Sequence, residues 1–127
     1  MSHTRPFITI FNDDDVFLDL MGELLAEEGY TAHSGLVDGN AYQYVKQTQP
    51  DLVILDFLIG KPQSAWNILE LIRLDPTTAH LPVLISSANT PLLRENGERL
   101  KQLQCAILQK PFDLADLLQQ VAALIPS

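Results

Sequence analysis

Polar residues follow several apolar segments of this chain, and their chemical types suit the binding of Mg²⁺ and the transfer of a phosphoryl group. In chain order they are Asn12, Asp13, Asp56, Ser86, Ser87 and Lys110. Mg²⁺ usually takes one or two carboxylates and completes its shell with water and phosphate oxygens. An aspartate can also act as a nucleophile and become an aspartyl phosphate, while a hydroxyl and an ammonium group hold the transferred oxygens. The set indicates a magnesium-assisted phosphoryl-acceptor site, provided that the fold brings these residues together.

Asp56 is the central member of this set because it ends the most apolar segment of the chain. Four apolar residues, Leu52-Val53-Ile54-Leu55, follow the turn pair Pro50-Asp51 and predict a strand that is buried on both faces. In an open parallel sheet, ligands bind just beyond the carboxyl ends of the strands. A lone aspartate after a strand is usually a cap or turn residue, and a lone surface lysine is usually only solvated. Acids, hydroxyls and a base at successive strand ends are much harder to explain in that way.

Strand and helix patterns alternate along the chain and predict how these residues are positioned. Strands are predicted over residues 7–11, 30–33, 52–56, 83–86 and 106–109. Helices are predicted over residues 16–28, 40–48, from about 64 to 74, 92–104, and after Asp113. The acids that follow Asn12, at positions 13–15, can cap the first helix, and Gly29 ends it. The alternation predicts a doubly wound α/β sheet, whose strand ends meet at one edge.

Composition limits the classes of function that fit. The chain has 127 residues, enough for one domain over residues 1–127, and its net charge of −8 disfavours direct contact with nucleic acid. The longest apolar run is too short to span a membrane, and no apolar segment typical of a secretory signal is found near Met1. With Cys105 as the single cysteine, no intrachain disulfide can form, and a small buried residue is favoured over a redox sensor. A cytoplasmic location is therefore expected.

Several motifs together resemble the response-regulator receiver domain of two-component signalling, over essentially the full length. They are Asn12-Asp13-Asp14, Gly29-Tyr30, the segment 50–56, the segment 81–88 and Lys110-Pro111-Phe112. The resemblance implies a flavodoxin-like receiver fold, with a five-stranded parallel sheet in the strand order 2-1-3-4-5 and five helices. It also implies a signalling domain that catalyses only its own phosphoryl transfer and is not otherwise an enzyme.

The resemblance also assigns expected roles around the acceptor. Asp56 would accept a phosphoryl group from a histidine kinase or a phosphotransfer protein. Asp13, Asp56 and the backbone carbonyl of Leu58 would bind Mg²⁺. Asn12 stands where the family usually has an acid, and it would reach the ion directly or through water. Leu58 and Asn89 occupy positions that influence hydrolysis; neither is a strong orienting group, so a long-lived phosphorylated state is expected.

A second group of positions is expected to transmit the effect of phosphorylation at Asp56 to the rest of the domain. Ser87 and Lys110 would contact the phosphoryl group and drive the switch together with Pro111, whose peptide bond to Lys110 is expected to be cis. Ile107 replaces the usual switch aromatic of the family. Because isoleucine has no polar tip, we expect it to stay packed.

Three other classes of protein share part of this pattern. A flavodoxin-like cofactor binder is disfavoured because residues 12–15 would repel a phosphate. A phosphatase with an aspartyl nucleophile would need a second acid at Leu58. The strongest alternative is a receiver-like interaction module that is not phosphorylated in use. Asn12 and the altered loop after Asp56 favour this module, whereas the retained Asp56, Ser87 and Lys110 oppose it.

Signal output is expected to pass through protein contacts, because the chain stops directly after its last predicted helix. The expected surface combines the helix over 92–104, the strand over 106–109 and the helix after Asp113. A downstream protein target is expected, and the sequence leaves open a homodimer through the same surface.

Overall fold

Five parallel strands form one sheet in the order β2-β1-β3-β4-β5. The computed structural model describes residues 5–12, 14–35, 40–56, 62–87, 94–109 and 113–125. The strands are β1 (Phe7–Phe11), β2 (Thr31–Gly35), β3 (Leu52–Asp56), β4 (Val83–Ser87) and β5 (Ala106–Gln109). The predicted doubly wound α/β sheet and its strand order are confirmed.

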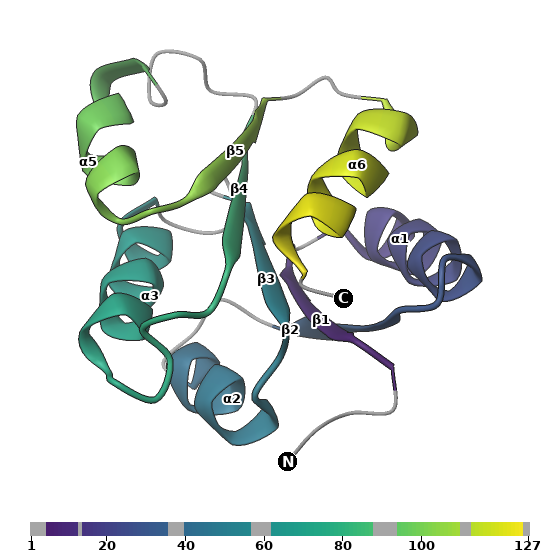
Figure 1. The fold of residues 1–127 in the computed structure, drawn as a ribbon, viewed down its shortest axis with the longest axis horizontal. Helices are drawn as coiled ribbons and strands as arrows, with labels where there is room; N and C mark the ends of the chain where they lie inside the picture. The colour runs from purple at the N-terminus through teal and green to yellow at the C-terminus, as the bar shows by residue number, and fades with distance from the viewer. Residues whose placement is uncertain are drawn as a thin grey trace.

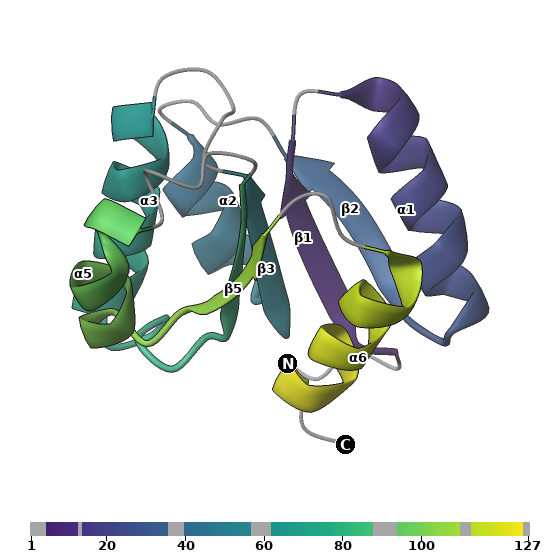
Figure 2. The same cartoon turned by 90° about the horizontal axis from the view of Figure 1, so that it is seen from above.

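Helices cover both faces of this sheet (Figures 1 and 2). The helices are α1 (Asp15–Glu27), α2 (Ala41–Thr48), α3 (Pro62–Leu74), α5 (Gly97–Gln102) and α6 (Leu114–Leu124). Figure 2 shows α1 and α6 on one face and α2, α3 and α5 on the other. Within the described residues, no helix has the length and apolar character that crossing a membrane requires.

The position of β3 between β1 and β4 explains its sequence. Every residue of β3 is buried, because helices cover both faces of the sheet. Its side chains alternate between two apolar clusters: Leu52 and Ile54 pack with residues of α1 and α6, whereas Val53 and Leu55 pack with residues of α2, α3 and α5. The strand that carries Asp56 is therefore held from both sides.

Most predicted element bounds agree with the structure to within two residues, and the largest difference concerns the fourth predicted helix. The prediction of one helix over 92–104 is wrong in its described part. Residues 94 and 95 are helical, but Asn96 forms a turn, and α5 covers only Gly97–Gln102. Asparagine and glycine both favour such an interruption, because asparagine bonds to nearby backbone in other conformations and glycine loses more entropy in a helix.

Helix α1 has a defined cap at each end, as its sequence predicts. At its start, the Asp14 carboxylate accepts hydrogen bonds from the backbone N–H groups of Val16 and Phe17, at 3.1 and 3.2 Å. At its end, Gly29 has φ = 92°, and the N–H of Tyr30 donates to the carbonyl of Leu25 at 2.9 Å. This left-handed glycine closes the helix and turns the chain into β2.

Gly22 is a point at which the stability of the domain can be raised. It lies inside α1, and a Cβ atom placed there would meet no atom within 4 Å. We expect Gly22→Ala to raise the free energy of unfolding by about 0.5–1 kcal/mol, because alanine loses less backbone entropy in a helix. Urea unfolding measures this change. The matched control is Gly29→Ala, which should lower stability by about 1–2 kcal/mol because of its positive φ. A destabilised Gly22→Ala variant would contradict the prediction.

A cluster of polar side chains joins α2 to the end of α3. Asp75 accepts hydrogen bonds from the Tyr42 hydroxyl and from the backbone N–H of Thr77, and the Lys46 ammonium lies 3.0 Å from its carboxylate. The bond from Tyr42, followed by the Thr77 and Lys46 contacts, holds the pKa of Asp75 well below its ordinary value of 3.8. A carboxyl with a depressed pKa in the folded state stabilises the fold above its ordinary pKa, and this contribution is lost as pH falls through the folded-state value.

The contribution of Asp75 should therefore disappear in acid. We expect Asp75→Asn to lower the free energy of unfolding at about pH 7, and we expect the difference from wild type to shrink steadily as pH falls below about 4. Urea unfolding across this range is the measurement. Asp19→Asn, an exposed position on α1, is the control for the loss of one acid. A difference between wild type and Asp75→Asn that stays constant from neutral to acid pH would rule out this role.

Candidate functional site

The carboxyl edge of the sheet brings Asn12, Asp56 and Ser86 into one row. Phe11 is in register with Leu55, so Asn12 comes level with Asp56, which is itself in register with Ser86. Strand alternation places all three on the face that packs against α1 and α6, because Ile10, Ile54 and Leu84 belong to that cluster. We call these three residues the strand-end row.

All members of the strand-end row are buried although all are polar. Asn12 and Asp56 are each 6% exposed, and Ser86 is 4% exposed. Buried polar groups are unfavourable unless they find hydrogen-bonding partners. A carboxylate in this place is therefore a feature that the surrounding residues must support.

A hydrogen bond links two members of the row. Asn12 Nδ2 donates to Asp56 Oδ2 at 3.3 Å, while Asn12 Oδ1 accepts from the backbone N–H of Asp14 at 2.9 Å. The second bond fixes the direction of the amide, because only its oxygen can accept from an N–H group. Asn12 thus presents a donor to Asp56 and directs its oxygen to the start of α1. The role expected for Asn12 toward a metal ion, directly or through water, stays a prediction.

Several predicted site residues lie outside the described part of the chain, so their expected roles stay predictions. They are Asp13, Leu58, Asn89, Lys110 and Pro111, together with the rest of the segment 57–61. The backbone of Ser87 is described: it ends β4, in register with Gln109 of β5. Ser87 therefore lies at the same edge of the sheet as Asp56.

Ile107 differs from its expected position. It was predicted to stay packed, yet its side chain is 38% exposed, so that prediction is wrong. Ile107 is in register with Ile85, a residue of the cluster on the side of α2, α3 and α5. β5 is an edge strand, and the only α5 residue buried in that cluster is Leu100. The exposed side chain follows from this sparse cover at the sheet edge.

Ser86 is the residue whose importance the sequence understated. The sequence places Ser86 beside Ser87 at the end of a strand, but the family resemblance assigns a role only to Ser87. In the structure, the Ser86 hydroxyl is buried and finds no hydrogen-bonding partner among the described residues. One feature of the sequence could have indicated this position: Ser86 is a hydroxyl residue that directly follows the apolar residues Val83-Leu84-Ile85 of a predicted strand.

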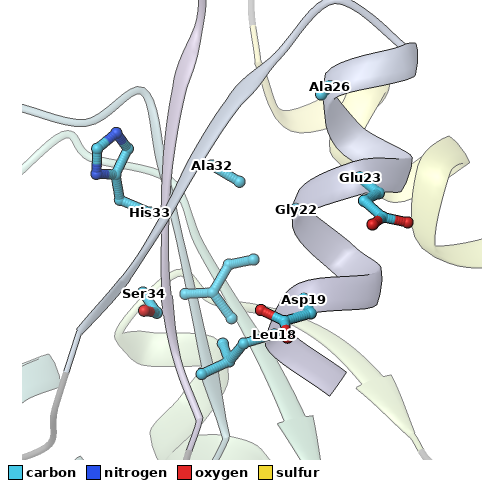
Figure 3. Close-up of a pocket in the computed structure, with 9 residues that line it drawn as sticks. Leu18, Asp19, Gly22, Glu23, Ala26, Ala32, His33 and Ser34 are labelled. Atoms are coloured by element: carbon cyan, nitrogen blue, oxygen red, sulfur yellow. The ribbon is translucent and has the colours of Figure 1, made fainter. Parts of the chain in front are cut away.

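A hollow of the described surface lies elsewhere, between α1 and β2 (Figure 3). Its volume is about 540 Å³, and small residues at Gly22 and Ala32 leave the space open. Asp19 and Glu23 extend from α1, whereas His33 projects from β2 away from that helix. Among the described residues, no group of three or more His, Cys, Asp or Glu side chains is arranged to hold a metal ion. This hollow therefore follows from small side chains, and the strand-end row is the better candidate site.

Cys105 does not offer a second nucleophile. Its thiol is largely buried, and burial raises its pKa to about 11 although Arg73 acts in the opposite direction. At neutral pH the group is therefore a protonated thiol, which is unreactive compared with a thiolate. The structural interpretation of this cysteine agrees with its packing against the cluster on the side of α2, α3 and α5.

The parallel sheet and the carboxylate at the end of its central strand define a flavodoxin-like α/β domain. The family model of the response regulator receiver domain matches residues 8–122, and the chain belongs to this family. The chain is 32% identical over 124 residues to the DNA-binding dual master transcriptional regulator RpaA of Synechocystis sp., covering 94% of this chain and 49% of that protein. It is 26% identical to the phosphate regulon transcriptional regulatory protein PhoB of Rhizobium meliloti, covering 94% of this chain and 52% of that protein. The chain thus spans about half the length of these relatives.

Solved structures show the same fold at lower sequence identity. The signal receiver domain of a putative LuxO repressor protein from Vibrio parahaemolyticus superposes with a TM-score of 0.82 at 22% identity, covering 95% of this chain and 90% of that chain. The chemotaxis response regulator CheY4 of Vibrio cholerae gives a TM-score of 0.80 at 19% identity, covering 95% of this chain and 99% of that chain. At these identities the structures establish the architecture, and the family model establishes membership.

Replacing Asn12 by an acid should change how the site responds to Mg²⁺. In Asn12→Asp, a second carboxylate would face Asp56 across the contact that is now 3.3 Å long. We expect lower stability without metal, because like charges repel, and Mg²⁺ binding that is about tenfold tighter. The increase in unfolding free energy caused by Mg²⁺ should then be larger than in wild type by up to about 1.4 kcal/mol.

Urea unfolding with Mg²⁺ and with a chelator measures this difference. Gln43→Glu, an exposed position on α2, controls for the added negative charge. If Mg²⁺ stabilises Asn12→Asp no more than Gln43→Glu, residue 12 does not face the metal site.

Proposed function

We propose that this domain is a phosphoacceptor of two-component signalling, in which Asp56 takes a phosphoryl group from a histidine kinase or a phosphotransfer protein and the modified domain signals through a protein partner. The observation that supports this proposal most directly is the burial of the Asp56 carboxylate at the end of the central strand. A carboxylate in that place is unfavourable for stability alone. Membership of the receiver family supports the same role.

The proposed step is an in-line displacement at phosphorus. An oxygen of the Asp56 carboxylate forms the new P–O bond while the P–N bond of the donor phosphohistidine breaks. The imidazole nitrogen keeps the electron pair and takes a proton. Such transfers depend mainly on positioning and on stabilising charge, and a strand held by neighbours on both sides supplies a rigid position.

The residues present fit a magnesium ion at this site. Asp56 contributes one buried carboxylate, and Asp13 and the carbonyl of Leu58 are the further ligands that we propose. Mg²⁺ accepts such a small protein donor set because water and phosphate oxygens fill the rest of its shell. When bound, the ion neutralises charge on the transferring phosphoryl group. Asn12 would act beside it through its amide N–H, which already faces Asp56.

A second candidate function is a docking module that is not phosphorylated in use. One observation favours it: the amide of Asn12 donates to Asp56, so a neutral group partly satisfies the acceptor carboxylate without a metal ion. In this case the fold would present its surface to a partner in one state only.

Intact-mass measurement after exposure to a small phosphodonor separates the two candidates. With Mg²⁺, we expect wild type to gain the mass of one phosphoryl group and Asp56→Asn to gain none. Asp19→Asn, a surface control on α1, should be modified like wild type. Modification that persists in Asp56→Asn, or that is equal in the presence of a chelator, contradicts the proposed site. A wild-type protein that gains no mass favours the docking module.

Output through the surface of α5, β5 and α6 remains part of the proposal. Ile107 on β5 and Leu114 on α6 expose 38% and 42% of their surface, which gives this region apolar contacts for a partner protein or for a second copy. The net charge of −8 opposes direct contact with nucleic acid. The name of the Synechocystis relative refers to DNA binding, but this chain matches only about half of that protein.

A further inference from the structure

Two buried hydroxyls have no hydrogen-bonding partner among the described residues, those of Thr9 and Ser86. Thr9 is 0% exposed and Ser86 is 4% exposed, so neither is open to bulk water. An unpaired buried hydroxyl is unfavourable, and each such group needs an explanation. The two differ in what lies beside them.

Ser86 is the direct cross-strand neighbour of Asp56. The two residues are in register in adjacent parallel strands, and both lie on the face that packs against α1 and α6. Neighbouring strands are about 4.8 Å apart, and the Ser86 hydroxyl makes no hydrogen bond to the Asp56 carboxylate itself. A group attached to Asp56 would therefore bring its oxygens to the side of the sheet on which the unpaired Ser86 hydroxyl lies.

Thr9 has no such neighbour. It lies three residues before Asn12, within β1, and is in register with Val53. Strand alternation turns its side chain to the opposite face, toward the cluster of α2, α3 and α5. A ligand at the carboxyl edge of the sheet cannot reach it. Thr9 therefore supplies an internal comparison: an equally buried and equally unpaired hydroxyl, away from the site.

We propose that Ser86 is a phosphoryl-positioning residue, whose hydroxyl donates a hydrogen bond to an oxygen of the phosphoryl group on Asp56. This inference rests on the proposed function and adds a second hydroxyl beside the one expected at Ser87. Phosphorylation brings acceptor oxygens to the end of β3, and the Ser86 hydroxyl is then paired. No covalent bond to Ser86 forms, and its proton stays on the hydroxyl.

The consequence is a difference between the two states of the domain. In the unmodified domain the hydroxyl stabilises nothing, whereas in the modified domain it forms a charge-assisted hydrogen bond. An interaction made in only one state shifts the equilibrium toward that state. Ser86 would thus stabilise the phosphorylated state of the domain without stabilising the unmodified state.

The test uses beryllofluoride, formed from Be²⁺ and fluoride in the presence of Mg²⁺, as a phosphoryl mimic on Asp56. Isothermal titration calorimetry measures its affinity, and urea unfolding measures the stability of the free domain. For Ser86→Ala we expect about a tenfold weaker affinity, equivalent to about 1.4 kcal/mol, with the stability of the free domain unchanged or raised. For Thr9→Val, an isosteric replacement, we expect unchanged affinity and a free domain that is equally or more stable.

The outcomes distinguish this inference from the proposed function. If wild type fails to bind the mimic, or if Asp56→Asn binds it equally well, the phosphoacceptor proposal fails. If wild type binds through Asp56 but Ser86→Ala has the same affinity, the phosphoacceptor proposal stands and the role of Ser86 is overturned. An equal loss of affinity in Ser86→Ala and Thr9→Val would also overturn it, because the effect would then come from the sheet as a whole.

Discussion

The burial of one carboxylate at the end of a fully apolar strand is the constraint on which the rest of the structure depends. β3 is buried over all five residues, and this requires helices on both faces of the sheet. Asp56 is the last of those residues and is 6% exposed. Burying a charge is unfavourable unless other groups supply hydrogen bonds or opposite charge. The residues around the carboxyl edge of the sheet differ in whether they supply such a hydrogen bond to Asp56.

Asn12 supplies a hydrogen bond to Asp56, and its orientation depends on its contact with the start of α1. Its amide oxygen is held by the N–H of Asp14, and the Asp14 carboxylate caps the same helix by accepting from Val16. The start of α1 therefore orients the amide that faces Asp56. The other end of α1 is closed by the left-handed Gly29. Helix capping, which the sequence indicated as local chemistry, thus also determines the geometry of the site.

The sequence predicted those parts of the molecule in which local pattern and fold agree. β3 and β5 were predicted at their observed bounds, and the start of α1 was predicted to be capped by one of the acids at positions 13–15, with Gly29 as its stop; the cap is Asp14. Three features could not be read in this way. The exposure of Ile107 depends on how little of β5 its covering helix reaches, the direction of the Asn12 amide depends on the N–H of Asp14, and the isolation of the Ser86 hydroxyl depends on all of its neighbours. Each is a property of tertiary contacts.

The strand-end row also shows how one change of residue can alter the balance between two states. An acid at position 12 would repel Asp56 and make the unmodified site depend on a metal ion. The amide that is present instead donates to Asp56, so the carboxylate is partly satisfied before any ligand arrives. That contact favours the unmodified state, because phosphorylation must replace or lengthen it. On the other side of Asp56, the Ser86 hydroxyl is unpaired among the described residues, and in our proposal it would act in the opposite sense by gaining a partner when phosphoryl oxygens arrive. If Asp56 is the phosphoacceptor that we propose, its neighbours on the two sides act on the equilibrium between the unmodified and the phosphorylated domain in opposite directions.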